Sequence, residues 1–173
     1  ARRAELPGDP RVLPEPEVMK TLAWGWIVKL LLINALAVFA FFGIFEYRLY
    51  VQRAQANRFK YNGKWPSENK SKVFWFESQN LDNMLRTLLF ALPIWTALEV
   101  GILHAYANGY VPWLSFAENP WYLAGLALVV PVIHETHFFL LHRLIHWGPL
   151  YKWVHSVHHN SVNPSPYSSL SMH

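Results

Sequence analysis

The chain has 173 residues, no cysteine and a formal net charge of +4, and 53% of its residues are hydrophobic and 16% aromatic. This length suits one domain, while so much apolar and aromatic content is unusual for a soluble protein and indicates a membrane protein. The lack of cysteine excludes disulfides, thiolate metal sites and cysteine nucleophiles, and the positive charge fits anionic lipid headgroups better than nucleic acid, for which we find no reading motif.

The N-terminal part of the chain divides into an arm and a first membrane span. Residues 1–20 hold four prolines among mixed charges, which predicts an extended arm. Residues 22–45 are nearly all apolar, and at about 1.5 Å per residue they are long enough to cross a hydrocarbon core of about 30 Å. Asn34 interrupts this span, and we expect Trp24 and Trp26 in the interfacial belt.

A basic loop follows the first span. Residues 46–80 contain seven Lys and Arg residues and no Asp, so the positive-inside rule places them on the cytoplasmic side. The many aromatic residues of the loop indicate that it lies along the membrane surface.

Two further spans are predicted, over residues 84–107 and 121–141, and the loop between them has no Lys or Arg. Two crossings return the chain to the cytoplasmic side where the histidines begin; the alternative is a hairpin in which Pro93 breaks the second helix. Because a charge is costly in hydrocarbon, we expect Glu99 to be paired or protonated. We expect His104 to make a hydrogen bond inside the bundle.

The histidines are concentrated at the C-terminal end, where eight of the nine lie between His134 and His173. If the third helix continues, steps of about 100° per residue place three of them within an arc of about 120°: His134, His142 and His146. Gly148-Pro149 then ends the helix, and three more converge on one side of the next segment: His155, His158 and His159.

His142 and His146, at i and i+4 on one face, and the three histidines of the next segment thus supply five imidazoles to one point near the membrane surface. Imidazoles packed together repel one another when protonated, and a metal ion removes this difficulty because it binds the neutral form. Nitrogen ligation favours Fe, Zn or Cu and argues against Mg or Ca. A zinc-protease HExxH motif is disfavoured because Phe138 stands at its second histidine, and haem fits less well because it needs only two axial ligands.

HRLIH at residues 142–146 and HSVHH at residues 155–159 resemble the HxxxH and HxxHH boxes of the fatty acid hydroxylase superfamily, the membrane di-iron family that contains the sterol desaturases. The flanking Leu150-Tyr151, and SLSMH at residues 169–173, are similar to the sterol desaturase branch. The resemblance covers about residues 131–173, whereas the upstream spans are similar to the family only in being apolar membrane spans.

This resemblance implies an all-α membrane protein, a transmembrane helical bundle with a cytoplasmic histidine-rich di-metal cap. Two iron ions would use O2 to hydroxylate or desaturate a C–H bond of a sterol or fatty acyl lipid. Electrons would come from a separate cytochrome b5-like or ferredoxin-type donor. The membrane would be the bacterial inner membrane or the endoplasmic reticulum.

We interpret the chain as an arm (1–20), a transmembrane region (21–141) with the basic cytoplasmic loop 46–80, and a histidine-rich segment (134–173). The expected metal ligands are five histidines with three further candidates: His142, His146, His155, His158 and His159, then His173, His137 and His134. Glu135 is expected to orient a ligand imidazole or to pair with Arg143.

Family members carry a further histidine box downstream of the second, so we expect this chain to be truncated at its C-terminus. The alternative is a degenerate family member that serves as a structural subunit, with partner subunits, in a larger membrane complex.

Overall fold

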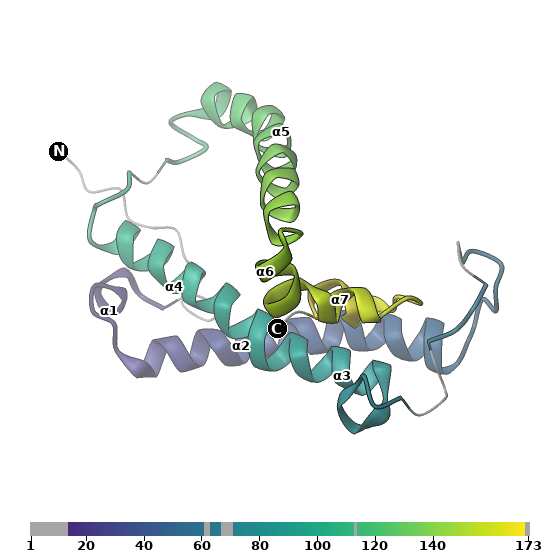
Figure 1. Ribbon diagram of the computed structural model, residues 1–173. Helices are drawn as coiled ribbons and strands as arrows, with labels where there is room; N and C mark the ends of the chain where they lie inside the picture. Colours follow the sequence, from purple (N-terminus) through teal and green to yellow (C-terminus); the bar gives the residue numbers. More distant parts are fainter. Residues whose placement is uncertain (1–13, 61–62, 67–70, 113, 172–173) are drawn as a thin grey trace.

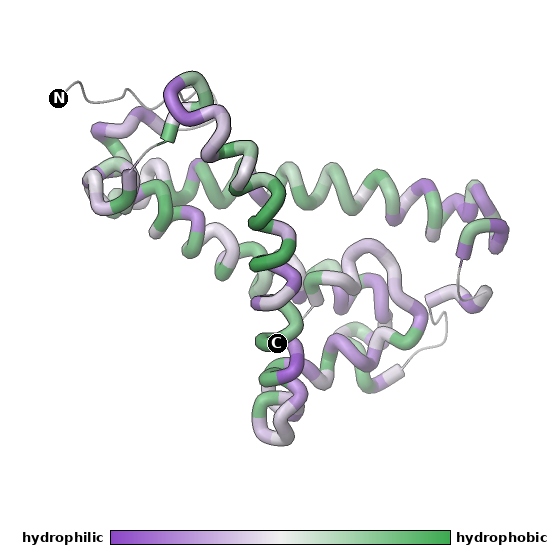
Figure 2. The backbone as a smooth tube through the Cα atoms, turned by 90° about the horizontal axis from the view of Figure 1, so that it is seen from above, coloured by the Kyte–Doolittle hydropathy of each residue, from purple (hydrophilic) through white to green (hydrophobic). Residues whose placement is uncertain are grey.

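The computed structural model describes residues 14–60, 63–66, 71–112 and 114–171, and the described residues contain helices and no strand (Figure 1). Three of the helices are long and apolar enough to cross a membrane: Trp24–Val51, Gln79–Ala107 and Pro120–Ile145. Figure 2 shows apolar residues along these helices and hydrophilic residues gathered in the segments that connect them. The predicted all-helical fold with three candidate spans is therefore confirmed.

The first span comprises α2 (Trp24–Phe45) and a π-helical turn, η1 (Glu46–Val51), that continues it beyond the predicted end. Part of the expected extended arm forms a short helix, α1 (Pro16–Met19), because a proline at the first helical position leaves no hydrogen bond missing. The rest of the arm, residues 1–13, lies outside the described residues.

The small apolar core lies where α1 and α2 meet the second span. Its buried members are Met19, Trp26, Leu30 and Val100. Trp24 is exposed as expected of an interfacial residue, but Trp26 is only 4% exposed, and its indole N–H donates to the Thr21 carbonyl at 2.8 Å. Tertiary packing thus buries the Trp26 ring, and the interfacial position of the two tryptophans stays a prediction.

The second span is a continuous helix of three parts: α3 (Gln79–Arg86), the π-helical η3 (Thr87–Ala91) and α4 (Leu92–Ala107). It begins earlier than predicted because the Ser78 side chain caps it, accepting from the Leu81 N–H. A 3-10 turn, η2 (Trp75–Glu77), precedes this cap. The helix runs through Pro93, directly after the π-helical turn, so the alternative of a helix broken at Pro93 is not observed.

Polar contacts join α2 to α4, which lie side by side (Figure 1). The Asn34 amide donates to Glu99 at 2.6 Å and to the Thr96 hydroxyl at 3.2 Å. The His104 ring contacts the Met19 carbonyl at 3.0 Å. The predictions of a paired Glu99 and of a structural hydrogen bond at His104 are confirmed.

The third span, α5 (Pro120–Ile145), stands apart from α2 and α4, and its axis runs across theirs (Figure 1). None of its residues is buried, and its helix contacts are with the short helices that follow it. Among the described residues, α2 and α4 thus pack as a pair, and the expected bundle of all three spans is not observed.

The C-terminal segment contains α6 (Gly148–Leu150), the π-helical η4 (Tyr151–His155), α7 (Ser156–Asn160) and the 3-10 helix η5 (Pro166–Leu170). Besides its contacts with α5, this segment is joined by hydrogen bonds to the first part of the second span. The Gln79 amide donates to the Asn163 carbonyl at 2.8 Å, and the Thr87 hydroxyl donates to the Tyr167 carbonyl at 3.0 Å. The histidine-bearing helices therefore lie between α5 and α3.

Candidate metal centre

The turn after α5 reverses the chain at the point that the sequence predicts. His146 caps the C-terminus of α5, and Trp147 adopts an extended conformation with ψ 133°. Gly148 and Pro149 then begin α6, where the missing N–H of proline costs no helical hydrogen bond. The reversal brings the second histidine group back toward the first.

Three histidines from the two sides of this turn form the tightest group. One nitrogen of each of His142, His146 and His155 lies within 4.8 Å of the other two. The Nε2 atoms of His142 and His146 are 3.1 Å apart. Metal–nitrogen bonds of about 2.0–2.1 Å place neighbouring ligand nitrogens about 3–4 Å apart, a range that includes the His142–His146 separation.

His158 and His159 extend the group into a continuous cluster of five imidazoles. The His159 ring centroid lies 4.7 Å from that of His155 and 5.1 Å from that of His146. The His158 ring is stacked on His155 with centroids 5.3 Å apart. The structure thus brings together all five residues of the two histidine boxes.

The π-helical turn η4 places His155 at the centre of the cluster. Such turns shift the register of the side chains and occur frequently at functional sites. His155 is 0% exposed, although it follows exposed residues on the same turn. Its ring centroid is 4.9 Å from His142 and 4.8 Å from His146.

The chemistry of the buried nitrogens tests whether a metal fits. Both ring nitrogens of His155 and Nδ1 of His158 are buried and have no hydrogen-bond partner. Leaving a buried polar group unsatisfied costs about 1–3 kcal/mol, and a metal bond would satisfy it. The residues present therefore fit a metal ion bound by nitrogen.

The electrostatics of the cluster favour neutral rings with free lone pairs. Burial, followed by the charges that His159, His158, His142 and His146 would carry, lowers the pKa of the His155 imidazole to about 4. Burial and the neighbouring histidines also lower the pKa of His146. At neutral pH these rings are therefore in the form that a metal ion binds.

Two of the three further candidate ligands are not brought into this cluster. His134 is exposed, and its Nδ1 lies 3.3 Å from the Glu135 carboxylate, so the observed partner of Glu135 is His134 and not Arg143. His137 is exposed on α5, with no ring contact to the cluster among the described residues. His173 lies outside the described residues.

Tyr151 is a site residue that the sequence analysis did not single out. Its ring is stacked on His146 with centroids 5.7 Å apart and lies 5.6 Å from the ring of His159. Its position four residues before His155 was the available signal, because residues at this spacing share one face of a helix.

A buried polar network behind the histidines was also missed. The Asn83 side-chain oxygen accepts from the hydroxyls of Ser161 and Ser171, each at 2.9 Å, and Asn83 is 0% exposed. These pairs are 78 and 88 residues apart in the chain, so no local spacing predicts them.

The chain is similar to curated fungal enzymes of sterol metabolism. It is 25% identical over 100 residues to the Delta(7)-sterol 5(6)-desaturase ERG3B of Gibberella zeae, a match covering 57% of this chain and 31% of that protein. It is 25% identical over 154 residues to the Delta(7)-sterol 5(6)-desaturase of Eremothecium gossypii, covering 88% of this chain and 38% of that protein. A shorter match, 36% identical over 42 residues, covers 24% of this chain and 14% of the methylsterol monooxygenase erg25A of Aspergillus fumigatus.

The chain thus spans less than half the length of these three relatives. Neither a protein-family model nor a solved structure matches it.

Proposed function

We propose that this chain, a distant homologue of the sterol 5(6)-desaturases and methylsterol monooxygenases of the sterol desaturase and fatty acid hydroxylase superfamily, acts as a membrane di-iron oxidoreductase. The reaction would use O2 to hydroxylate or desaturate a C–H bond of a sterol or fatty acyl lipid. The observation that carries the proposal is the cluster of five imidazoles, with both nitrogens of the buried His155 lacking a hydrogen-bond partner.

In this proposal the histidines of the two boxes bind two metal ions. His142, His146 and His155 would hold one ion, since their nitrogens already converge. His158 and His159 would contribute to the second, since their rings adjoin His155. The bound irons would supply the O2 chemistry that acts on an unactivated carbon, which the side chains alone do not offer.

The residues around the histidines would keep the rings in place. Tyr151 packs against His146 and His159 and restricts their rotation. Asn83 holds Ser161 and Ser171, and so anchors the segment that follows α7 to the second span. Fixing ligand side chains in this way raises metal affinity because less ordering remains for the binding step.

Access to the site would follow from the membrane spans. The apolar surface of α5 is exposed along its length up to His142, so a lipid in the bilayer would reach the histidines along this helix. The basic loop supports a cytoplasmic location for the site under the positive-inside rule. Electrons would come from a separate cytochrome b5-like or ferredoxin-type protein.

Metal and lipid analysis of the full-length protein tests this proposal. We expect about two irons per chain and an O2-dependent oxidised lipid that disappears when the gene is deleted. His155→Ala should weaken iron binding at least about 100-fold, because it removes a central ligand. His137→Ala serves as the matched control, since it removes an exposed histidine of the same segment.

Stoichiometric zinc in active protein, or full turnover in His155→Ala, would contradict the proposal. A stably folded protein that binds no metal would instead support the structural-subunit alternative.

A further inference from the structure

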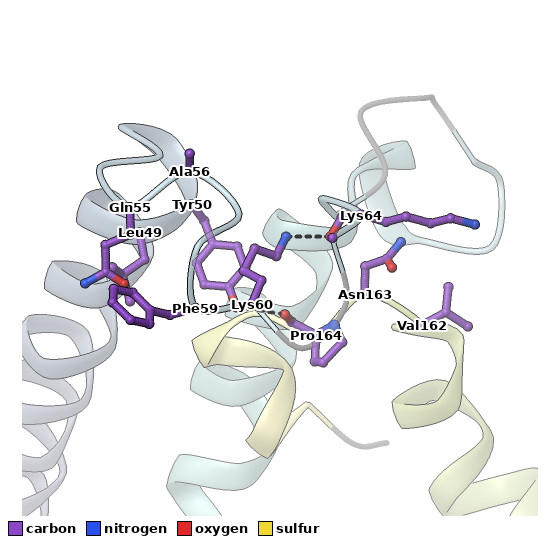
Figure 3. A pocket seen from close by; sticks show the side chains of 11 residues that line it. Leu49, Tyr50, Gln55, Ala56, Phe59, Lys60, Lys64, Val162, Asn163 and Pro164 are labelled. Carbon is purple, nitrogen blue, oxygen red and sulfur yellow. Dashed lines mark hydrogen bonds between the residues drawn. The ribbon is translucent and has the colours of Figure 1, made fainter.

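A second candidate site shares no lining residue with the histidine cluster. It is a pocket of about 610 Å³ between the end of the first span, the loop that follows it, and the loop after α7 (Figure 3). Pockets of about 300–1,000 Å³ are typical of sites for small molecules. The proposed metal chemistry makes no use of it.

The pocket is basic. Lys60 and Lys64 line it, and none of its described lining residues is Asp or Glu. The Lys60 ammonium lies 3.7 Å from the centroid of the Trp65 ring, and the Arg53 guanidinium lies 4.6 Å from the same ring. Burial, and then the charge of Arg53, lower the pKa of Lys60. These cations are held close together, so an anion beside them would be stabilised.

The rest of the lining is mixed: Tyr50, Gln55 and Asn163 are polar, and the apolar part borders the membrane span. Leu49 belongs to the last turn of the first span, which ends at Val51. Phe59 and Val162 add further apolar surface. The pocket therefore combines cations with apolar walls at the level where a membrane helix leaves the hydrocarbon. This combination matches an amphipathic ligand with an anionic head.

The pocket also connects the first span to the histidine-bearing segment. The Tyr50 hydroxyl donates to the Pro164 carbonyl at 3.0 Å, and both residues lie at the centre of the pocket (Figure 3). Asn163 and Pro164 follow α7, which carries His158 and His159. A ligand here would touch two segments more than 90 residues apart in the chain, from Lys64 to Val162.

We infer that this pocket binds the phosphate headgroup of an anionic membrane phospholipid. The Lys60 ammonium, which also donates to the Lys64 carbonyl, acts as the point charge for the phosphate, and the Lys64 side chain, which extends away from Lys60 (Figure 3), adds positive charge to the same pocket. Leu49, Phe59 and Val162 supply apolar surface for the glycerol and the first methylenes. Binding holds the loop after α7 against the first span.

Native mass spectrometry of the full-length protein in mild detergent tests the inference. Dioleoyl phosphatidylglycerol and dioleoyl phosphatidylcholine are compared as ligands. We expect the anionic lipid to bind at least about tenfold more tightly, and Lys60→Gln/Lys64→Gln to remove this preference. Lys72→Gln is the control, because it removes one exposed lysine of the same basic loop that does not line the pocket.

A competition arm distinguishes a lipid from a free anion. Dihexanoyl phosphatidylglycerol should displace bound lipid at a concentration at least about tenfold lower than inorganic phosphate does, because the apolar walls add to the affinity. Equal potency of inorganic phosphate would overturn the assignment to a lipid.

An unchanged lipid preference in the double variant would overturn the site itself. Circular dichroism checks that the variants keep the wild-type helix content, and Lys60→Gln alone, expected to reduce the preference about threefold to tenfold, replaces the double variant if that variant misfolds. Equal binding of phosphatidylcholine by the wild-type protein would also overturn the inference.

Discussion

His155 combines complete burial with two ring nitrogens that make no hydrogen bond. By contrast, His104 is the histidine of a purely structural contact, with its ring against the Met19 carbonyl. The two residues show why composition alone does not separate a ligand from a structural histidine. In the sequence, the spacing of the two boxes identified the ligand histidines. Five histidines at i, i+3 and i+4 intervals are more than structural hydrogen bonds would require.

Replacing His155 in the metal-free protein tests whether this residue is a metal ligand or a structural histidine. We expect His155→Leu to leave the free energy of unfolding of the metal-free protein unchanged or higher, because it removes an unsatisfied buried group that costs about 1–3 kcal/mol. The same substitution should abolish the stabilisation that iron gives to the wild-type protein. Denaturant titrations with and without iron measure both effects.

His104→Leu provides the comparison, and it should destabilise the metal-free protein by about 1 kcal/mol through the loss of its hydrogen bond. A destabilised metal-free His155→Leu variant would mean that His155 has a structural role.

At the level of elements, hydropathy predicted where the long helices lie. It did not predict the helix ends that capping sets or the contacts that packing sets. The apolar runs located all three spans, yet the Ser78 cap starts the second span earlier and the π-helical turn η1 extends the first. Gly148-Pro149 correctly predicted the break after α5, because glycine and proline determine the backbone conformation of the residues next to them. The burial of Trp26 and the anchoring of the C-terminal segment on α3 depend on distant contacts, which local patterns do not encode.

The hydrogen bonds of Asn83 join α3 to the C-terminal segment, and their contribution to the free energy of unfolding can be measured. Asn83→Ala removes the shared acceptor of two buried hydroxyls, and we expect it to lower the free energy of unfolding by about 2 kcal/mol. It should also weaken iron binding, because the histidine-bearing helices lose their support on α3. Denaturant titration and metal analysis provide the measurements.

Asn80→Ala is the matched control on the same helix. The side-chain oxygen of Asn80 is buried without a hydrogen-bond partner, so its removal should cost less than 1 kcal/mol. Equal effects of the two substitutions would show that the Asn83 network does not anchor the segment.

In the whole molecule, the histidine cluster lies at the junction of two parts. The α2–α4 pair, joined by Asn34 and Glu99, carries the C-terminal segment through α3. The third span and its C-cap contribute His142 and His146, and among the described residues its main contacts are with the short helices that follow it. Metal bound by both groups would therefore tie α5 to the rest of the protein, which makes the proposed cofactor part of the architecture as well as of the chemistry.

Iron K-edge X-ray absorption of the full-length protein tests most directly whether the histidines on the two sides of Gly148-Pro149 share metal ions. We expect a nitrogen shell at about 2.0–2.2 Å with the outer scattering of imidazole rings, and a reduced imidazole contribution in both His142→Ala and His155→Ala. Iron without imidazole scattering, or a spectrum that neither substitution changes, would contradict this expectation.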